Sequence, residues 1–176
     1  MGQVTEGYQI MNAIVSAVTT DIRPDNNFDQ PGVIWTDLDP VLGWREFVWF
    51  GNTGTNTVAT VIGQTIYWAD NYKLTGSNSL TDSTRDCVLG VAVSVVPKGS
   101  YGWAQIKGYH AHVLTYDGTY AQGQRIMSSS YAGLGIVCGA LGTAPTYTIL
   151  GTALGAATNI SSNLYYVPAQ LNVGGF

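Results

Sequence analysis

The chain has two histidines, and they stand two residues apart at His110 and His112. On a strand, residues i and i+2 point to the same face, so this spacing could place two imidazoles on one metal ion. A metal site needs one or two further ligands, and the sequence suggests no Asp, Glu or His partner nearby. We therefore expect two surface or interface histidines and no metal site.

Other chemistry-bearing patterns are sparse. Asp37 and Asp39 have the spacing of a carboxylate pair, as in a glycosidase. They precede Pro40 in a turn-rich stretch, however, where Asp is common for turn and capping reasons. The chain contains no Gly-x-Ser-x-Gly elbow, no phosphate-binding Gly-x-x-x-x-Gly-Lys-Ser/Thr loop and no Gly-x-Gly-x-x-Gly motif. We expect no catalytic residues and no cofactor. An enzyme would require the two histidines to converge with a carboxylate.

The composition excludes several classes of partner. Charged residues make up 10 % of the 176 residues, with 7 Lys and Arg against 11 Asp and Glu. A net-negative chain with so few cations cannot build a phosphate-neutralising surface, so no nucleic acid is expected. The sequence contains no run of 18 or more apolar residues, so no membrane span is expected, and the N-terminus does not resemble a signal peptide. Cys87 and Cys138 lie far apart and are expected to be reduced core residues, made in a reducing cytoplasm.

The sequence texture predicts an all-β chain. Residues 1–45 carry many turn formers and are expected to be an irregular N-terminal arm, while residues 46–176 form a compact β-barrel or sandwich. The body is rich in Val, Ile, Tyr, Trp and Thr between Gly, Asn, Asp and Ser. Its predicted strands are 46–50, 57–62, 64–69, 87–96, 101–107, 110–116, 124–128, 134–138, 146–155 and 163–171.

An internal similarity runs through the body. Gly63-Gln64-Thr65-Ile66 returns as Gly123-Gln124-Arg125-Ile126, and Val88-Leu89-Gly90-Val91-Ala92 returns as Ile149-Leu150-Gly151-Thr152-Ala153. The two elements are almost equally spaced in each copy. This predicts two half-repeats, about 57–108 and 117–172, each covering the apolar face of the other.

Aromatic residues give the candidate contact surface. Trp and Tyr dominate both cores and interfaces, because they bury a large area and keep a polar group. Trp68 and Trp103 lie in strand-like segments, where core burial is the commoner outcome, while Trp35 and Trp44 must pack on the body or on a partner. Stacking on sugar rings is an alternative use. The interface candidates are Trp35, Trp44, Trp49, Tyr101, Trp103, His110 and His112.

The order of motifs resembles a known family. The segment 88–108 with Leu89-Gly90-Val91-Ala92 and Gly102-Trp103-Ala104-Gln105, then Asp117-Gly118, Ala121-Gln122-Gly123, Ile149–Ala153 and Gln170-Leu171-Asn172, is similar to the capsid decoration (cement) proteins of tailed bacteriophages. The resemblance covers about residues 57–172 and rests on structural glycine and apolar positions.

The resemblance implies a β-barrel, often trimeric, that sits on the outside of a phage head and bridges capsomers. The expected partners are the major capsid protein and further copies in a homotrimer. The expected location is the exterior of the virion capsid, after synthesis in the host bacterial cytoplasm. A glycan- or receptor-binding β module on a virion surface is the alternative. The position of the tryptophans discriminates the two, since a sugar site needs them on a solvated groove.

Overall fold

The computed structural model describes residues 22–23, 32–52, 58–68, 76–77, 88–116, 118–129, 133–137 and 148–173, and every regular element in these ranges is a β-strand. The strands are β1 (Ile34–Asp39), β2 (Gly43–Gly51), β3 (Thr65–Trp68), β4 (Gly76–Ser77), β5 (Val88–Ala92), β6 (Tyr101–Thr115), β7 (Arg125–Ser128), β8 (Gly135–Val137), β9 (Ile149–Ala153), β10 (Thr158–Ser161) and β11 (Leu164–Asn172). The prediction of an all-β chain of short strands is confirmed.

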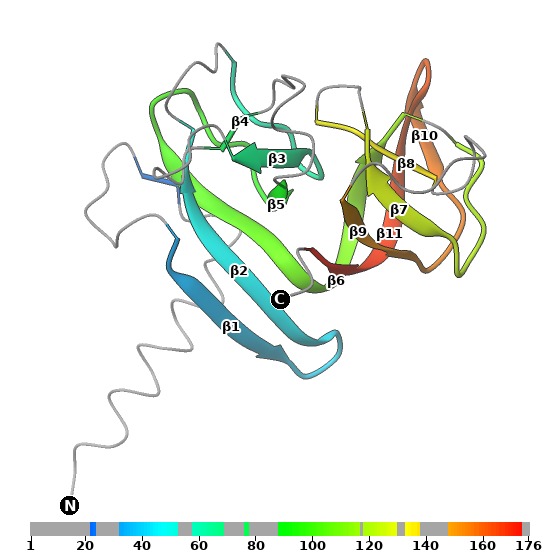
Figure 1. Ribbon diagram of the computed structural model, residues 1–176, viewed down its shortest axis with the longest axis horizontal. Helices are drawn as coiled ribbons and strands as arrows, with labels where there is room; N and C mark the ends of the chain where they lie inside the picture. Colours follow the sequence, from blue (N-terminus) through cyan, green and yellow to red (C-terminus); the bar gives the residue numbers. More distant parts are fainter. Residues whose placement is uncertain are drawn as a thin grey trace, which may run out of the picture.

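All strands belong to one sheet, whose main path runs β10-β11-β9-β7-β8-β6-β5-β3-β4, with β2 also on β6 and β1 on β2. The pairings are antiparallel, apart from one parallel bridge between Thr115 and Gly135. The sheet as a whole is not closed, and its short strands fit a sandwich-like fold rather than a barrel. Figure 1 shows β6 running between a group around β3, β4 and β5 and a group around β7, β9 and β11.

The long strand β6 replaces two shorter predicted strands. The predictions 101–107 and 110–116 are parts of one strand that continues through Gly108. Gly108 has a positive φ of 91°, and the pairing register between β2 and β6 shifts beside it, between Glu46 and Phe47. A β-bulge therefore bends the strand without ending it.

Residues 32–45 correct the predicted arm. β1 pairs with β2 along its whole length, so the last part of the 1–45 segment is a β-hairpin of the sheet and not irregular. Asp37 and Asp39 read as turn formers in the sequence, but both carboxylates pair with Arg45, which faces Asp37 in the register. Pairing across the hairpin stabilises β1 as a strand, although its local sequence is typical of a turn-rich segment. Residues 1–21 and 24–31 lie outside the described residues.

Two parts of the chain form the same arrangement of strands. The first unit comprises β2, β3, β4, β5 and the N-terminal half of β6, and it carries β1 as an additional strand on β2. The second unit comprises the C-terminal half of β6, then β7, β8, β9 and β11, so both units share β6. The matched pairings are Thr65↔Val91 with Arg125↔Thr152, Ile66↔Gly90 with Ile126↔Gly151, Tyr67↔Val88 with Met127↔Ile149, Trp68↔Gly76 with Ser128↔Gly135, and Ala92↔Ala104 with Ala153↔Ala169.

The shared glycine motif has a steric cause in both units. A Cβ on Gly90 would lie 2.9 Å from the carbonyl oxygen of Gln105, and a Cβ on Gly151 would overlap the carbonyl oxygen of Gln170. Gln105 and Gln170 occupy equivalent places in the register. The central strand of each unit therefore approaches its neighbour too closely for any side chain, which explains why Leu-Gly-x-Ala occurs twice.

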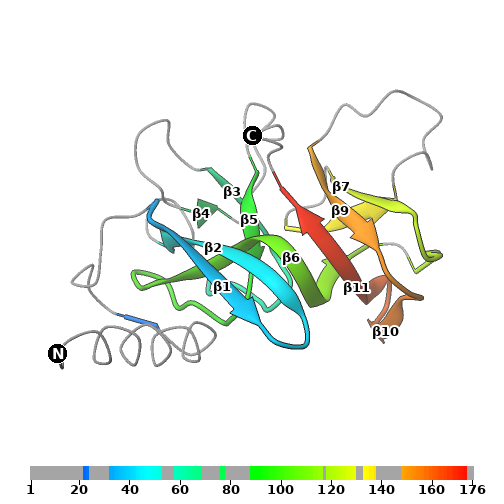
Figure 2. The same cartoon turned by 90° about the horizontal axis from the view of Figure 1, so that it is seen from below.

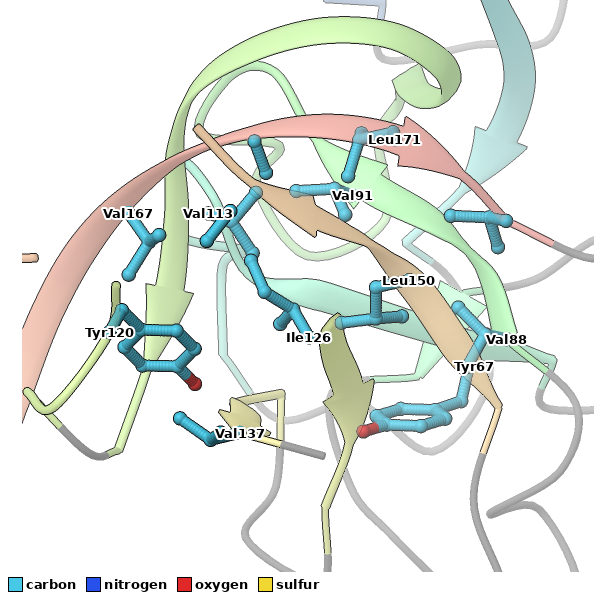
Figure 3. Packing of buried hydrophobic residues seen from close by; sticks show 13 residues of the cluster. Tyr67, Val88, Val91, Val113, Tyr120, Ile126, Val137, Leu150, Val167 and Leu171 are labelled. Carbon is cyan, nitrogen blue, oxygen red and sulfur yellow. The ribbon is translucent and has the colours of Figure 1, made fainter. Parts of the chain in front are cut away.

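The two units share one hydrophobic core. The largest cluster contains Tyr67 and Val91 from the first unit together with Ile126, Leu150 and Val167 from the second (Figure 3). Burial in this cluster raises the pKa of the Tyr67 phenol above its usual range. Because apolar side chains of both units pack together, they form one body and not two domains. Two smaller clusters, one around Phe50 and Leu89 and one around Trp49, belong to the first unit.

Candidate interaction surfaces

The structure removes two aromatic residues from the predicted interface. Trp49 and Trp103 face each other across β2 and β6, both fully buried, with ring centroids 4.9 Å apart. They form a core with Phe47, so their prediction as interface residues is wrong for this fold. A β-strand alternates its faces, and the sequence around both tryptophans does not tell which face is inside. Trp68 lies in β3, and its side chain is outside the described residues.

Tyr101 and Trp35 lie at the margin of this aromatic core. Tyr101 stacks on Trp49 with 6.3 Å between ring centroids, and both Tyr101 and Trp35 are partly buried against the cluster. Tyr101 also exchanges two backbone hydrogen bonds with Arg23, which ties the chain before β1 to the start of β6. These two residues can contribute a ring edge to a partner, but most of their area is used within the chain.

Among the aromatic residues predicted for the interface, Trp44 is the most exposed, at 65 % of its area. It lies directly opposite Leu38 in the β1–β2 register, so both side chains point to one face of the hairpin. Ile34, on the same face, and Val41 in the turn are exposed by 58 % and 86 %. We call the set Ile34, Leu38, Val41, Leu42 and Trp44 the hairpin surface. Apart from Trp44, sequence reasoning missed it, although the alternation at 34, 36 and 38 could have indicated a strand face.

On the opposite face of the hairpin, next to the turn, a polar group holds the hairpin in shape. The Arg45 guanidinium pairs with the carboxylates of Asp37 and Asp39, and the Asp37 side chain is almost fully buried. Asp39 Oδ1 also accepts hydrogen bonds from the backbone N–H groups of Val41 and Leu42, both 2.8 Å long. These two bonds hold the pKa of Asp39 below its usual range. The carboxylates that resembled a catalytic pair therefore serve as strand and turn supports.

A second group of exposed apolar side chains lies on the first unit, beyond β2. The segment around Thr60 lies beside residues 94–96, because Thr60 donates its backbone N–H to the Val96 carbonyl and its hydroxyl to the Ser94 carbonyl. This arrangement exposes four apolar side chains, which we call the loop surface: Val58, Val61, Ile62 and Val95. Sequence reasoning predicted a strand at 57–62, whereas the described residues 58–62 have no strand.

The spacing of the two histidines predicted that they lie on the same face of a strand, but in the structure they do not. The register between β6 and β11 slips between Ala169↔His110 and Val167↔Val113, so three residue steps on β6 match two on β11. This bulge turns His110 into the core and leaves His112 exposed, where its ring meets Tyr166 edge-on at 5.0 Å. No group of three His, Cys, Asp or Glu side chains that could hold a metal occurs among the described residues.

His110 is a buried, neutral histidine. The backbone N–H of His112 donates to His110 Nδ1 at 3.2 Å, so that nitrogen is the acceptor. Burial lowers the pKa of His110 to about 4, with smaller contributions from the charges of His112 and Arg45. The ring therefore remains uncharged at neutral pH, as a core residue must.

A hollow of about 160 Å³ connects the two apolar surfaces. Its lining includes Leu42 of the hairpin surface, Ile62 of the loop surface, and Arg45, His110 and His112 between them. The arrangement can bind a partner through apolar contacts around a small polar centre.

No helix among the described residues is long and apolar enough to span a membrane. No protein-family model matches the chain, and the searches of curated proteins and of solved structures give no significant match.

Proposed function

We propose that this chain is a non-enzymatic structural protein of a tailed-phage virion, a capsid decoration protein that binds the outside of the head. It stabilises the shell by bridging neighbouring major capsid proteins. The protein would be made in the host bacterial cytoplasm and would act on the assembled particle. The observation that carries the proposal is the presence of two separate exposed apolar surfaces on one β body.

Bridging requires at least two contact surfaces whose relative position is fixed. The hairpin surface and the loop surface both belong to the first unit, and β2 and β6 connect them through antiparallel pairing. Exposed apolar groups of this kind mark protein contacts, and interface centres are depleted of charge. A chain with 10 % charged residues agrees with this use. The order of motifs supplies the partner, since it resembles that of capsid decoration proteins.

The proposal is tested by adding the purified chain to particles that lack it and measuring co-sedimentation. We expect the double variant Val61→Lys/Ile62→Lys to lose at least tenfold in affinity, because two charges would be buried at the contact. Ile160→Lys changes an exposed residue of β10 outside both surfaces and should bind like the unchanged chain. Equal binding of the two variants would remove the loop surface from the capsid contact.

The consequence for the particle is mechanical. Binding to the closed shell and not to the opened one stabilises the closed shell by mass action. We expect decorated particles to release DNA at a higher temperature than undecorated ones. Identical release temperatures at saturating protein would contradict a decoration role.

One observation supports a second candidate, a glycan-binding module. Trp44 is exposed on a strand face, where an indole can stack on a sugar ring. Trp49 and Trp103 are buried and can line no groove, which weakens this candidate. A glycan array separates the two functions, since only the glycan-binding candidate predicts binding that Trp44→Ala abolishes.

A further inference from the structure

Within the described part of the chain, β1 is an edge strand that pairs with β2 alone. Figure 2 shows it on the far side of β2 from β6. The Trp49 N–H donates to the Val33 carbonyl at 3.0 Å, so the backbone N–H and C=O groups of the odd-numbered residues point towards β2. Backbone bonding alternates along an antiparallel strand. The N–H and C=O groups of Ile34, Thr36 and Leu38 therefore point away from β2.

Among the residues that the structure describes, nothing gives this edge the usual protection against pairing. Natural edge strands are blunted by outward Lys, by Pro, by bulges or by very short length. β1 has six residues in unbroken register, and its three outward-bonding residues are two exposed aliphatics and a threonine. Its acidic residues Asp37 and Asp39 point to the opposite face, where Arg45 neutralises them.

We propose that β1 pairs in antiparallel fashion with β1 of a second copy of this chain, across a two-fold axis at Thr36. Thr36 then faces Thr36 of the second copy, and Ile34 faces Leu38 on both sides of the axis. All three outward-bonding residues of each strand find a partner. The two hairpins become one four-stranded sheet, as in other β-augmentation contacts.

The side chains are self-complementary in this register. Leu38 lies opposite Trp44 within the hairpin, and Ile34 lies opposite Val48. The contact therefore builds an apolar row across four strands, from Trp44 through Leu38 to Ile34 and Val48 of the second copy. Two-fold symmetry generates this row twice, once on each side of Thr36.

The neighbouring registers are worse for reasons of charge and length. Moving the axis to Asp37 would place two aspartates directly opposite each other, and like charges in that position destabilise a sheet. Moving it to Trp35 would place Leu38 opposite Gly32, which lies before the strand. The axis at Thr36 keeps both strands paired and the aspartates apart.

The contact stands on the hairpin alone and does not depend on the capsid function. It uses part of the hairpin surface, and a pair of copies still presents two loop surfaces at a fixed relative position, as bridging requires. It also requires no change in any trimer that the chain forms through other faces.

A pair of cysteine variants of the full chain tests the register. In Thr36→Cys the two Cα atoms would be about 5.5 Å apart, within the range of a disulfide. In Leu38→Cys the new thiols would be about 13 Å apart, four residues along the strand. Under mild oxidation at micromolar concentration we expect a covalent dimer from Thr36→Cys and not from Leu38→Cys. The unchanged chain measures the background from Cys87 and Cys138.

A covalent dimer from Leu38→Cys, or none from Thr36→Cys, overturns the register. Sedimentation tests the contact itself: Ile34→Lys/Leu38→Lys should raise the dissociation constant of the pair at least tenfold, while Val41→Lys in the turn should not. Both sites are exposed, so the fold should persist, and circular dichroism checks this. A monomeric unchanged chain whose β1 amides resist hydrogen exchange would mean that another segment of the same chain covers the edge, and would overturn the proposal.

Discussion

The two units of the body share one pattern of strands and turns, but their equivalent turns lie in different surroundings. In each, a four-residue turn leads into the first repeated strand: residues 61–64 before β3 and 121–124 before β7. In each turn a glycine with positive φ donates its N–H to an alanine carbonyl at 2.8 Å, Gly63 to Ala92 and Gly123 to Ala153. The local sequence thus fixes the same turn twice.

The surroundings of the turns are different. The Gly63 carbonyl also accepts a hydrogen bond from Leu114 at 2.8 Å, and Thr65 donates its N–H to the Gly133 carbonyl at 2.8 Å. A Cβ on Gly63 would overlap the carbonyl oxygen of His112, whereas a Cβ on Gly123 would meet nothing within 4 Å. The first turn is locked between its own unit and the next, while the second faces solvent. The repeated sequence therefore specifies the turn. The free-energy cost of substituting the turn glycine depends instead on the residues that pack around each turn.

The strongest test of this difference is a matched pair of substitutions. Both Gly63→Ala and Gly123→Ala incur the strain of a positive φ, about 1–2 kcal/mol. Gly63→Ala also forces backbone against backbone at the β6 bulge, so we expect it to lower the free energy of unfolding by at least ~3 kcal/mol in total. Urea denaturation measures both. Equal losses would show that the junction of the two units is not tightly packed.

His110, on β6 at the same junction between the two units, should make the stability of the protein depend on pH. Folding lowers the pKa of His110 from 6.5 to about 4, so between these values the unfolded chain binds more protons than the folded one. Stability is therefore complete above about pH 6.5 and falls as the pH drops towards 4, by up to about 3 kcal/mol. Below pH 4 the loss no longer grows from this residue.

Denaturation at pH 7.0, 5.5 and 4.5 checks this expectation in three chains. His110→Gln should reduce the slope between pH 6.5 and 4.5, and His112→Gln, at an exposed ring, should keep it. If the slope survives in His110→Gln, a different group causes the acid sensitivity.

A smaller effect is expected where the first unit has an element that the second lacks. β1 has no counterpart in the second unit, and Arg45 with Asp37 and Asp39 supports it. Asp37→Asn should cost about 1–2 kcal/mol, discounted from the larger value of a fully buried pair because Arg45 keeps Asp39 and is partly exposed. Hydrogen exchange should show faster opening of β1 and unchanged protection of β7 and β9. Uniform loss of protection would mean that β1 unfolds only with the whole sheet.

The sequence was sufficient for what depends on local chemistry and on repetition. The β-branched and aromatic segments gave the all-β class, and the matched motifs at 63–66 and 123–126 coincide with matched strand pairings. It was insufficient for what depends on a distant partner. Asp37 looks like a turn residue until Arg45 faces it, and the same-face rule for His110 and His112 fails because β11 imposes a bulge. Core burial was the commoner expectation for Trp103 and is confirmed, but the sequence did not indicate it for Trp49, because the neighbouring strands determine which face of a strand is buried.

The finest test concerns the side chains that close the two turns. Gln64 Oε1 accepts the Val61 N–H at 2.9 Å, and Gln124 Oε1 accepts the Ala121 N–H at 2.7 Å. The loss of one such hydrogen bond by itself costs about 0.5–1 kcal/mol. Gln64 is buried and its amide lies against Gly133, so Gln64→Ala also leaves a gap at the junction and should cost about 1–2 kcal/mol. Gln124→Ala should stay near the lower value, because its side chain is only partly buried. The difference between the two losses in the free energy of unfolding measures how far the second unit supports the first turn. A larger loss for Gln124→Ala than for Gln64→Ala would contradict this support.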